Sequence, residues 1–337
     1  MIIKSIRLVN FRNYVDSTFS FNNETNQIIA QNGAGKTNIL EGICVSATGK
    51  TNRGVRDREL VRFGEEFYRL ECDFVAGERE QQIVIIYDGN KKKISLNDVD
   101  LKKTSELIGK LAIVTFSPDD LFIIKQAPKF RRRLIDSVLC QIDSKYLFTL
   151  NRYNKALMQK RELLKKRVQK SEIIVWNESL LETGVEIAKR RLEYVKRLEK
   201  LANEKYNDMM GLPLKLEYKS DFLEDASAKL DNYIEKEIMM EKPLVGVQKD
   251  DLEILAGGRE AKLYSSQGQI RAGVIALKLA EIAILEEEIG EKPVLLLDDV
   301  MSELDEERRA YIAGHIKGVQ TVLTTTAGEA GENCIYL

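Results

Sequence analysis

The chain has 337 residues, 44% of them hydrophobic and 31% charged, so it has enough apolar material for a folded core and is neither disordered nor fibrous. Its 52 Lys and Arg nearly balance its 53 Asp and Glu, and the net charge of −1 by itself excludes no class of partner. No apolar run approaches the roughly 20 residues of a membrane-spanning helix, and the charged N-terminus does not resemble a signal peptide. We therefore expect a cytoplasmic protein without membrane contact.

Cysteine and histidine are scarce in this sequence. The four cysteines lie far apart without a Cys-x-x-Cys pair, which is typical of reduced thiols in a cytosolic protein. His315 is the single histidine, which disfavours a Ser-His-Asp triad and a histidine-rich metal centre. Any chemistry must come from Lys, Asp, Ser, Thr and backbone amides.

Hydrophobic periodicity predicts α/β character at both ends of the chain and helices in the middle. In the first third, the pattern predicts one helix at 37–47 and strands at 2–10, 26–30, 67–75, 82–87 and 92–96. From Phe116 to about Met240 the sequence is mainly helical and highly charged, with one strand-like stretch at 214–218. In the last third, predicted helices and strands alternate again, with a helix at 269–288 and strands at 294–297 and 321–325.

This order favours an α/β domain that is built from both ends of the chain. We expect residues 1–116 and 243–337 to form that domain and residues 117–242 to form an inserted, mainly helical, basic lobe. Within the lobe, residues 125–170 contain fourteen Lys and Arg but only three acids, a net charge of 14 − 3 = +11. Such a field attracts polyanions, whereas Tyr146, Phe148 and Tyr153 are expected to pack inside the lobe.

A glycine-rich loop lies between the second strand and the first helix. Its sequence, AQNGAGKT at Ala30–Thr37, fits a phosphate-binding loop in which glycines turn backbone N–H groups towards phosphates and the helix N-terminus adds positive charge. Lys36 is expected to reach the β- and γ-phosphates, and the Thr37 hydroxyl to bind Mg²⁺. The expected nucleotide-binding residues are Ala30, Gln31, Asn32, Gly33, Ala34, Gly35, Lys36, Thr37 and Asn38. Ala30 replaces the glycine that is usual at the first position of such a loop. An alanine is tolerated there if the φ angle of the residue stays negative.

A second set of polar residues follows the apolar strand at 294–297. Asp298 stands at the strand's carboxyl end, where α/β sheets place ligands, and is suited to hold Mg²⁺. Asp299 is then placed to orient or deprotonate an attacking water. An N-cap pair for the next helix is the structural alternative, but two adjacent carboxylates favour a cation.

Two further segments indicate a site shared between two subunits. Ser266, Gln267, Gly268 and Gln269 open a long helix and provide a second anion-binding helix end, besides serving as an ordinary N-cap. One chain gains little from two phosphate-binding helix ends, so this one is expected to contact a nucleotide that is bound by the phosphate-binding loop of a partner subunit. Ser302 and Asp305 follow the strand at 294–297 and its two aspartates, at the distance expected of a dimer-contact loop.

These motifs resemble the ATP-binding-cassette class and, within it, the SMC-like RecF family of DNA-repair ATPases. The resemblance covers nearly the whole chain and rests on the segments Ile6–Tyr14, Asn32–Asn38, Phe116–Leu121, Pro128–Arg133, Ser266–Gln269 and Leu296–Asp305. It departs from the family at Ala30, at Ile270 in place of a Gln, and at Val247-Gln248-Lys249 in place of Pro-His-Arg.

The resemblance implies an ABC-type ATPase head with an inserted helical lobe. Lys36, Thr37 and Asp298 would bind ATP and Mg²⁺, Asp299 and Lys36 would be catalytic, and Ser266 with Gly268 would contact the γ-phosphate across a dimer. It also implies a weak, DNA-stimulated ATPase that dimerises with ATP on single- and double-stranded DNA. With RecO and RecR it would load recombinase at gaps. As a hypothesis, the DNA-binding residues are Lys129, Arg131, Arg132 and Arg133.

Three alternatives stay open at this stage. A transporter's cassette subunit shares the loop and signature, but generally lacks an insertion between Lys36 and Ser266. A nuclease fused to a cassette needs a separate acidic cluster, for which the C-terminal segment offers only Glu329 and Glu332. A structural clamp with a degenerate ATP site has Ala30 as its only support.

Overall fold

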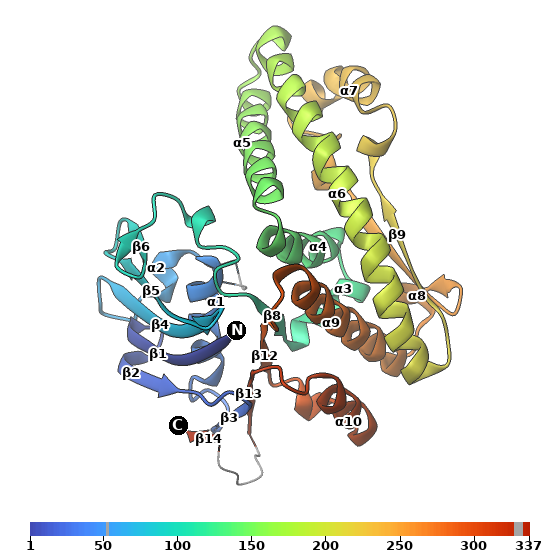
Figure 1. Cartoon of the computed structure of the whole chain (residues 1–337). Helices are drawn as coiled ribbons and strands as arrows, with labels where there is room; N and C mark the ends of the chain where they lie inside the picture. Colours follow the sequence, from blue (N-terminus) through green and yellow to red (C-terminus); the bar gives the residue numbers. More distant parts are fainter. Residues whose placement is uncertain (52–53, 327–332) are drawn as a thin grey trace. The chain divides into compact units, whose positions relative to one another are not determined.

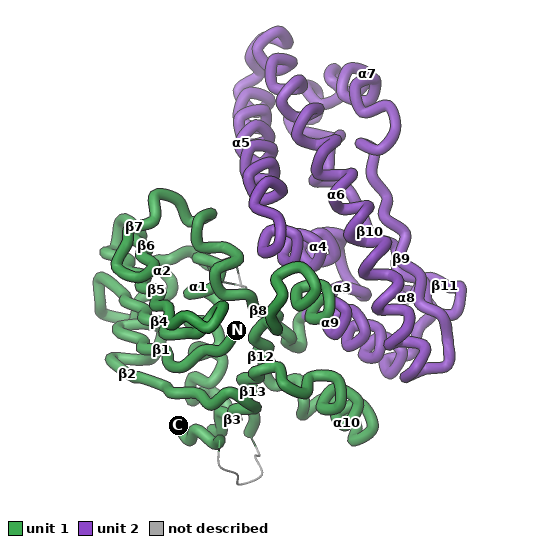
Figure 2. Tube along the Cα trace, in the orientation of Figure 1, with its two compact units in different colours: residues 1–119, 281–337 green, residues 120–280 purple. Residues whose placement is uncertain are grey.

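The computed structural model describes residues 1–51, 54–326 and 333–337 (Figure 1); Glu329 and Glu332 fall outside these ranges. Two compact units make up the chain, residues 1–119 with 281–337 and residues 120–280 (Figure 2). Both chain ends lie in the first unit, and the second is inserted between them. The mixed α/β fold with an inserted helical region is therefore confirmed.

The second junction between the units differs from the division expected at 242. Strand β10 (Asp251–Ala256) pairs antiparallel with β9 (Leu214–Lys219), and the hairpin strand β11 (Arg259–Glu260) completes a three-stranded sheet. Because β9 belongs to the insertion, this pairing keeps the chain in the second unit until residue 280.

The first unit contains a six-stranded antiparallel sheet with apolar residues at alternate positions. In spatial order its strands are β2 (Tyr14–Ser20), β1 (Ile2–Phe11), β4 (Tyr68–Ala76), β5 (Arg79–Tyr87), β6 (Lys92–Leu96) and β7 (Val99–Asp100). One face buries residues such as Ile6, Leu8 and Leu70 against the helix α1 (Lys36–Thr48), while the short helix α2 (Asp57–Leu60) follows later.

A five-stranded parallel sheet positions the candidate site in the same unit. In spatial order its strands are β14 (Cys334–Tyr336), β3 (Thr25–Ile29), β13 (Thr321–Thr325), β12 (Val294–Asp298) and β8 (Ile113–Phe116). The parallel strands all present their carboxyl ends at one edge, where α/β sheets bind ligands. The glycine-rich loop, Asp298 and the end of β13 therefore meet at this edge. Helix α10 (Glu306–His315) connects β12 to β13.

The second unit is mainly helical. Its helices are α3 (Phe122–Lys125), α4 (Pro128–Ile142), α5 (Ser144–Lys166), α6 (Lys170–Met210), α7 (Ala226–Met240), α8 (Ala261–Tyr264) and the first part of α9 (Gln267–Ile289). Tyr146 and Tyr153 are buried between helices as expected. Phe148 is 59% exposed, so its expected place in the interior is wrong. Among the described residues, no helix has an apolar stretch long enough to span a membrane.

Candidate nucleotide site and neighbouring polar clusters

The glycine-rich loop runs from the end of β3 into α1. Gly33 and Gly35 both have left-handed backbone angles, with φ of 84° and 107°. A Cβ on Gly35 would lie 2.4 Å from the Asn13 side chain, so glycine is required there by conformation and by space. In the described part of the chain, no side chain caps the N-terminus of α1 and no acid lies in its first turn. The helix end is thus suited to an anion.

The lysine of this loop is held close to the loop's own backbone. Lys36 is buried, and its ammonium group donates to the carbonyl oxygens of Ala30 at 2.5 Å and Gln31 at 3.1 Å. Ala30 is not among the residues with positive φ, so the alanine fits the first loop position without strain. A bound phosphate would compete with these two carbonyls for the lysine.

Two residues from distant parts of the sequence converge beside the loop. The Thr37 hydroxyl donates to Asp298 Oδ1 at 2.8 Å, although the two residues are separated by 261 positions. One hydroxyl and one carboxylate are the oxygen ligands that Mg²⁺ uses together with phosphates and water. The donor set therefore fits the expected magnesium site.

Asp299 adopts an uncommon backbone conformation for a residue other than glycine, with φ of 55°. Its backbone N–H donates to the Thr324 hydroxyl at 2.9 Å, and the Ser302 hydroxyl donates back to its carbonyl at 2.8 Å. Asp305, the other expected dimer-contact residue, is the N-cap of α10 and accepts from the backbone N–H of Arg308. Asp305 thus has a structural role within its own chain.

The turn between β1 and β2 contributes residues that the sequence analysis missed. The Asn13 side chain donates to the Ala34 carbonyl at 3.2 Å and accepts from Asn38, and the Tyr14 hydroxyl donates to the Gly35 carbonyl. Burial raises the pKa of Tyr14 to about 12, so this donor stays protonated at neutral pH. The segment Ile6–Tyr14 belongs to the family resemblance, but the sequence does not assign Asn13 or Tyr14 to the loop, because that contact depends on the fold.

The predicted signature residues lie in the second unit, at the start of α9. Ser266 and Gln269 form a reciprocal capping box: the backbone N–H of Gln269 donates to the Ser266 hydroxyl, and that of Ser266 donates to the Gln269 side chain. Gln267 is exposed and Gly268 partly exposed. The N-cap interpretation is therefore correct for Ser266, and it leaves the helix end accessible.

The four candidate DNA-binding residues on α4 differ in accessibility. Arg131 is buried; its guanidinium makes a double contact with the Asp251 carboxylate at 2.6 and 3.0 Å and donates to two carbonyls. Arg132 is half-buried and donates to the Asp250 carbonyl, and burial lowers its pKa. Within the described residues, Lys129 and Arg133 are exposed and form no ion pair. Of the four candidates, these two are therefore the most accessible.

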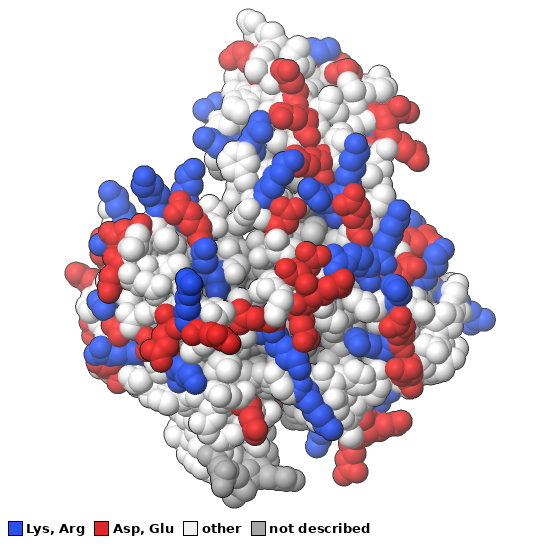
Figure 3. Space-filling model, in the orientation of Figure 1, with Lys and Arg blue, Asp and Glu red and all other residues white. Residues whose placement is uncertain are grey.

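Several of the basic residues at 125–170 form ion pairs with acids from distant parts of the sequence. Examples are the pairs Lys145–Glu186, Arg152–Glu182, Lys160–Glu237, Arg167–Glu241 and Lys170–Glu235. On the face shown in Figure 3, basic and acidic side chains are interspersed. The local net charge of +11 therefore overstates the field of the folded unit.

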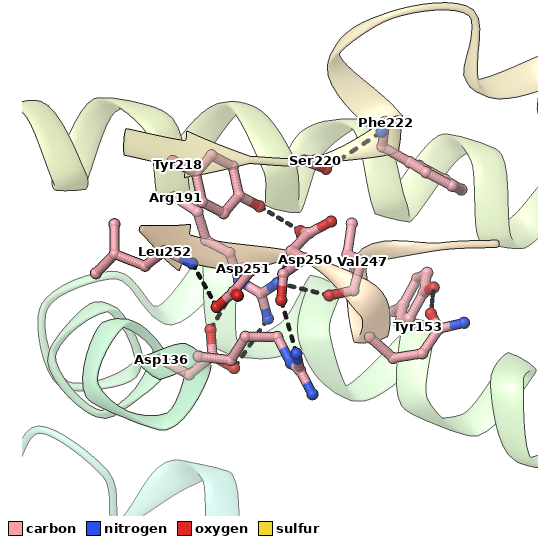
Figure 4. A network of polar contacts seen from close by, with 12 residues as sticks. Asp136, Tyr153, Arg191, Tyr218, Ser220, Phe222, Val247, Asp250, Asp251 and Leu252 are labelled. Atoms are coloured by element: carbon pink, nitrogen blue, oxygen red, sulfur yellow. Dashed lines mark hydrogen bonds and ion pairs between the residues drawn. The ribbon is translucent and has the colours of Figure 1, made fainter. Parts of the chain in front are cut away.

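The segment that departs from the family pattern joins a buried polar network (Figure 4). Arg191 donates to Asp250 and to the Val247 carbonyl, and Tyr218 also donates to Asp250. The Gln248 side chain accepts from the Tyr153 hydroxyl. These contacts give the segment a structural role within the second unit.

Comparison with known proteins supports what the geometry indicates. A family model described as an AAA domain matches residues 5–253. Proteins named "DNA replication and repair protein RecF" from Agathobacter rectalis and Acetivibrio thermocellus are 40% and 38% identical to this chain. The matches cover 97% and 99% of this chain and 92% and 95% of those proteins.

Comparison with solved structures gives the same result as comparison with these relatives. A structure described as the recombination mediator protein RecF-ATPrS in the RecFOR pathway has a TM-score of 0.94 at 34% identity, covering 99% of this chain and 95% of that chain. The Smc head domain of Pyrococcus furiosus shares the fold, with a TM-score of 0.56 at 18% identity, over 97% of this chain and 90% of that chain. Fold and site thus define an ATPase of the ABC type with an SMC-like head. More particularly, the chain belongs to the RecF family of DNA replication and repair proteins, which confirms the resemblance seen in the sequence.

Proposed function

We propose that this protein is an ATP-dependent DNA-binding switch of recombinational repair and replication, acting in the cytoplasm. In this proposal two copies dimerise when ATP is bound, and slow, DNA-stimulated hydrolysis separates them. The observation that carries the proposal is the contact of Thr37 with Asp298 beside a glycine-rich loop whose helix end is free of capping side chains among the described residues.

Within the nucleotide site, the loop residues bind the phosphates and the acidic residues serve the metal and the attacking water. The nine residues Ala30–Asn38 surround the phosphates, and Lys36 leaves the carbonyls of its own loop to neutralise the β- and γ-phosphates. Thr37 and Asp298 hold Mg²⁺, which offsets the negative charge of the phosphates. Asp299 orients the attacking water, with its backbone held by Thr324 and Ser302.

The remaining roles act between subunits and on partners. Ser266 and Gly268 of each copy contact the γ-phosphate held by the other, and Ser302 and Asp305 lie at the dimer contact. Of the four α4 residues, Lys129 and Arg133 contact the phosphates of single- or double-stranded DNA at gaps. The relative solved with ATPrS is described as part of the RecFOR pathway, which supports RecO and RecR as partners in loading recombinase.

Sedimentation with ATP and Mg²⁺, with and without duplex DNA, tests this proposal on the wild type and on Ser266→Arg. We expect the wild type to dimerise with ATP, whereas Ser266→Arg binds ATP but stays monomeric because the arginine blocks the γ-phosphate contact. Ser265→Ala is the matched control and should dimerise normally. A wild type that binds ATP yet stays monomeric at micromolar concentration would contradict the switch.

A further inference from the structure

Thr324 lies beside the two acidic residues of the candidate site. In the parallel sheet it is in register with Asp298, since β13 and β12 are neighbours. Its side chain is 1% exposed. Its hydroxyl accepts from the backbone N–H of Asp299 at 2.9 Å and donates to Asp298 Oδ1 at 3.0 Å. A single buried hydroxyl thus contacts both members of the acid pair.

The two hydrogen bonds of Thr324 stabilise the backbone conformation of Asp299 and the orientation of the Asp298 carboxylate. The left-handed backbone of Asp299 is unfavourable for a residue with a Cβ, and anchoring its N–H stabilises that conformation. Asp298 Oδ1 accepts from Thr37 as well as from Thr324, so the two hydroxyls together fix the orientation of the carboxylate. Because the Thr324 hydroxyl uses its proton and a lone pair at once, it has one preferred rotamer.

We propose that Thr324 is a positioning residue for ATP hydrolysis. Through one hydroxyl it holds the Asp298 carboxylate towards Thr37 and keeps the Asp299 backbone in the conformation that aims its side chain. This inference rests on the proposed roles of Asp298 in binding Mg²⁺ and of Asp299 in orienting water. A polar residue is favoured here because an apolar one would remove the acceptor of the partly buried N–H of Asp299.

The test compares Thr324→Val, which removes the hydroxyl and keeps the shape, with Thr324→Ser, which keeps the hydroxyl. We expect Thr324→Val to lower kcat at least about tenfold, because it removes both hydrogen bonds of the Thr324 hydroxyl, and to raise the Mg²⁺ concentration at half-maximal rate several-fold. Binding of ATP in the presence of EDTA should not change. Thr324→Ser should recover both kcat and the Mg²⁺ requirement.

Thr321→Val is the matched control, because Thr321 is buried on the same strand and its hydroxyl donates only to the Val319 carbonyl among the contacts found in the described residues. It should keep wild-type kcat and Mg²⁺ dependence.

If Thr324→Val does not fold, Thr324→Ala replaces it, with the same expectations. Wild-type kcat and Mg²⁺ dependence in the valine or alanine variant, or equal losses in Thr324→Ser, would overturn the inference. Full hydrolysis by Asp298→Asn and Asp299→Asn would instead overturn the proposed function.

Discussion

Arg191 on α6 and Asp250, the residue before β10, form a buried ion pair in which Nη1 and Oδ2 lie 3.0 Å apart. Arg191 also pairs with Asp136 on α4 at 2.9 Å (Figure 4). Burial opposes the charged form of Arg191, yet Asp136 raises its pKa well above the usual value. One guanidinium thus joins two helices and a sheet within the second unit.

Removing this guanidinium should destabilise the second unit strongly. Arg191→Met leaves Asp250 as a buried carboxylate without its cation, which typically costs about 3–5 kcal/mol. Arg190→Met changes the neighbouring, partly exposed arginine and should cost at most about 0.5 kcal/mol. Urea unfolding followed by far-UV circular dichroism measures both variants. Equal stability of the two variants would show that the buried pair contributes no more than the surface one.

The loss in Arg191→Met should also depend on pH. Burial already raises the pKa of Asp250 in the wild type, and losing Arg191 raises it further. A carboxyl group whose pKa is higher in the folded state favours folding at low pH, and this contribution is lost as pH rises through the folded pKa. The stability difference between wild type and variant should therefore be smaller at pH 5 than at pH 7. A difference that grows on acidification would refute this explanation.

The glycine-rich loop offers a test that separates conformational strain from steric contact. Gly35→Ala introduces a Cβ at φ of 107° and within 2.4 Å of Asn13, so we expect ATP affinity to fall at least about tenfold. Gly64→Ala places a Cβ at φ of 87° with no described atom within 4 Å. It should lower stability by about 1 kcal/mol and leave ATP affinity unchanged. Calorimetric titration with ATP measures affinity, and thermal melting measures stability.

The parts of the site that the sequence predicts are those whose residues are close together in the chain. The loop at Ala30–Thr37 and the pair Asp298–Asp299 each form a local pattern after an apolar strand, so spacing alone locates them. Asn13 and Thr324 reach the same site only through strand pairing and turn placement. One sequence without its fold gives no signal for such contacts.

Charge shows the same difference between local and long-range information. The sequence places Arg131 in a basic run, but its partner Asp251 is 120 positions away and neutralises it in the folded unit. Likewise, the end of the insertion at residue 280 depends on the pairing of β9 with β10, which periodicity along the chain does not determine.

The accessibility of the α4 residues makes a prediction about DNA binding. Replacing both Lys129 and Arg133 with Gln should weaken DNA binding and reduce the slope of log affinity against log salt by about two. Arg131→Gln should lower thermal stability, because Asp251 loses its partner, while the salt slope changes little. Fluorescence anisotropy at several salt concentrations measures the slopes. A wild-type slope in the double variant would exclude these two residues from the DNA contact.

The buried pair of Lys160 and Glu237 allows a test of what a charge contributes to this unit. The two groups lie 2.6 Å apart, Lys160 also donates to Asn177, and Glu237 accepts from the backbone N–H groups of Leu244 and Val245. Lys160→Met alone should cost about 3–5 kcal/mol, because the Glu237 charge stays buried without its cation.

Adding Glu237→Gln to Lys160→Met should restore much of that stability. The glutamine keeps an oxygen for the two backbone N–H groups and removes the charge, so the double variant should be more stable than Lys160→Met. A double-mutant cycle based on urea unfolding gives the coupling free energy between the two side chains. If the double variant is less stable than Lys160→Met, then the loss comes from the missing lysine contacts rather than from an unpaired carboxylate.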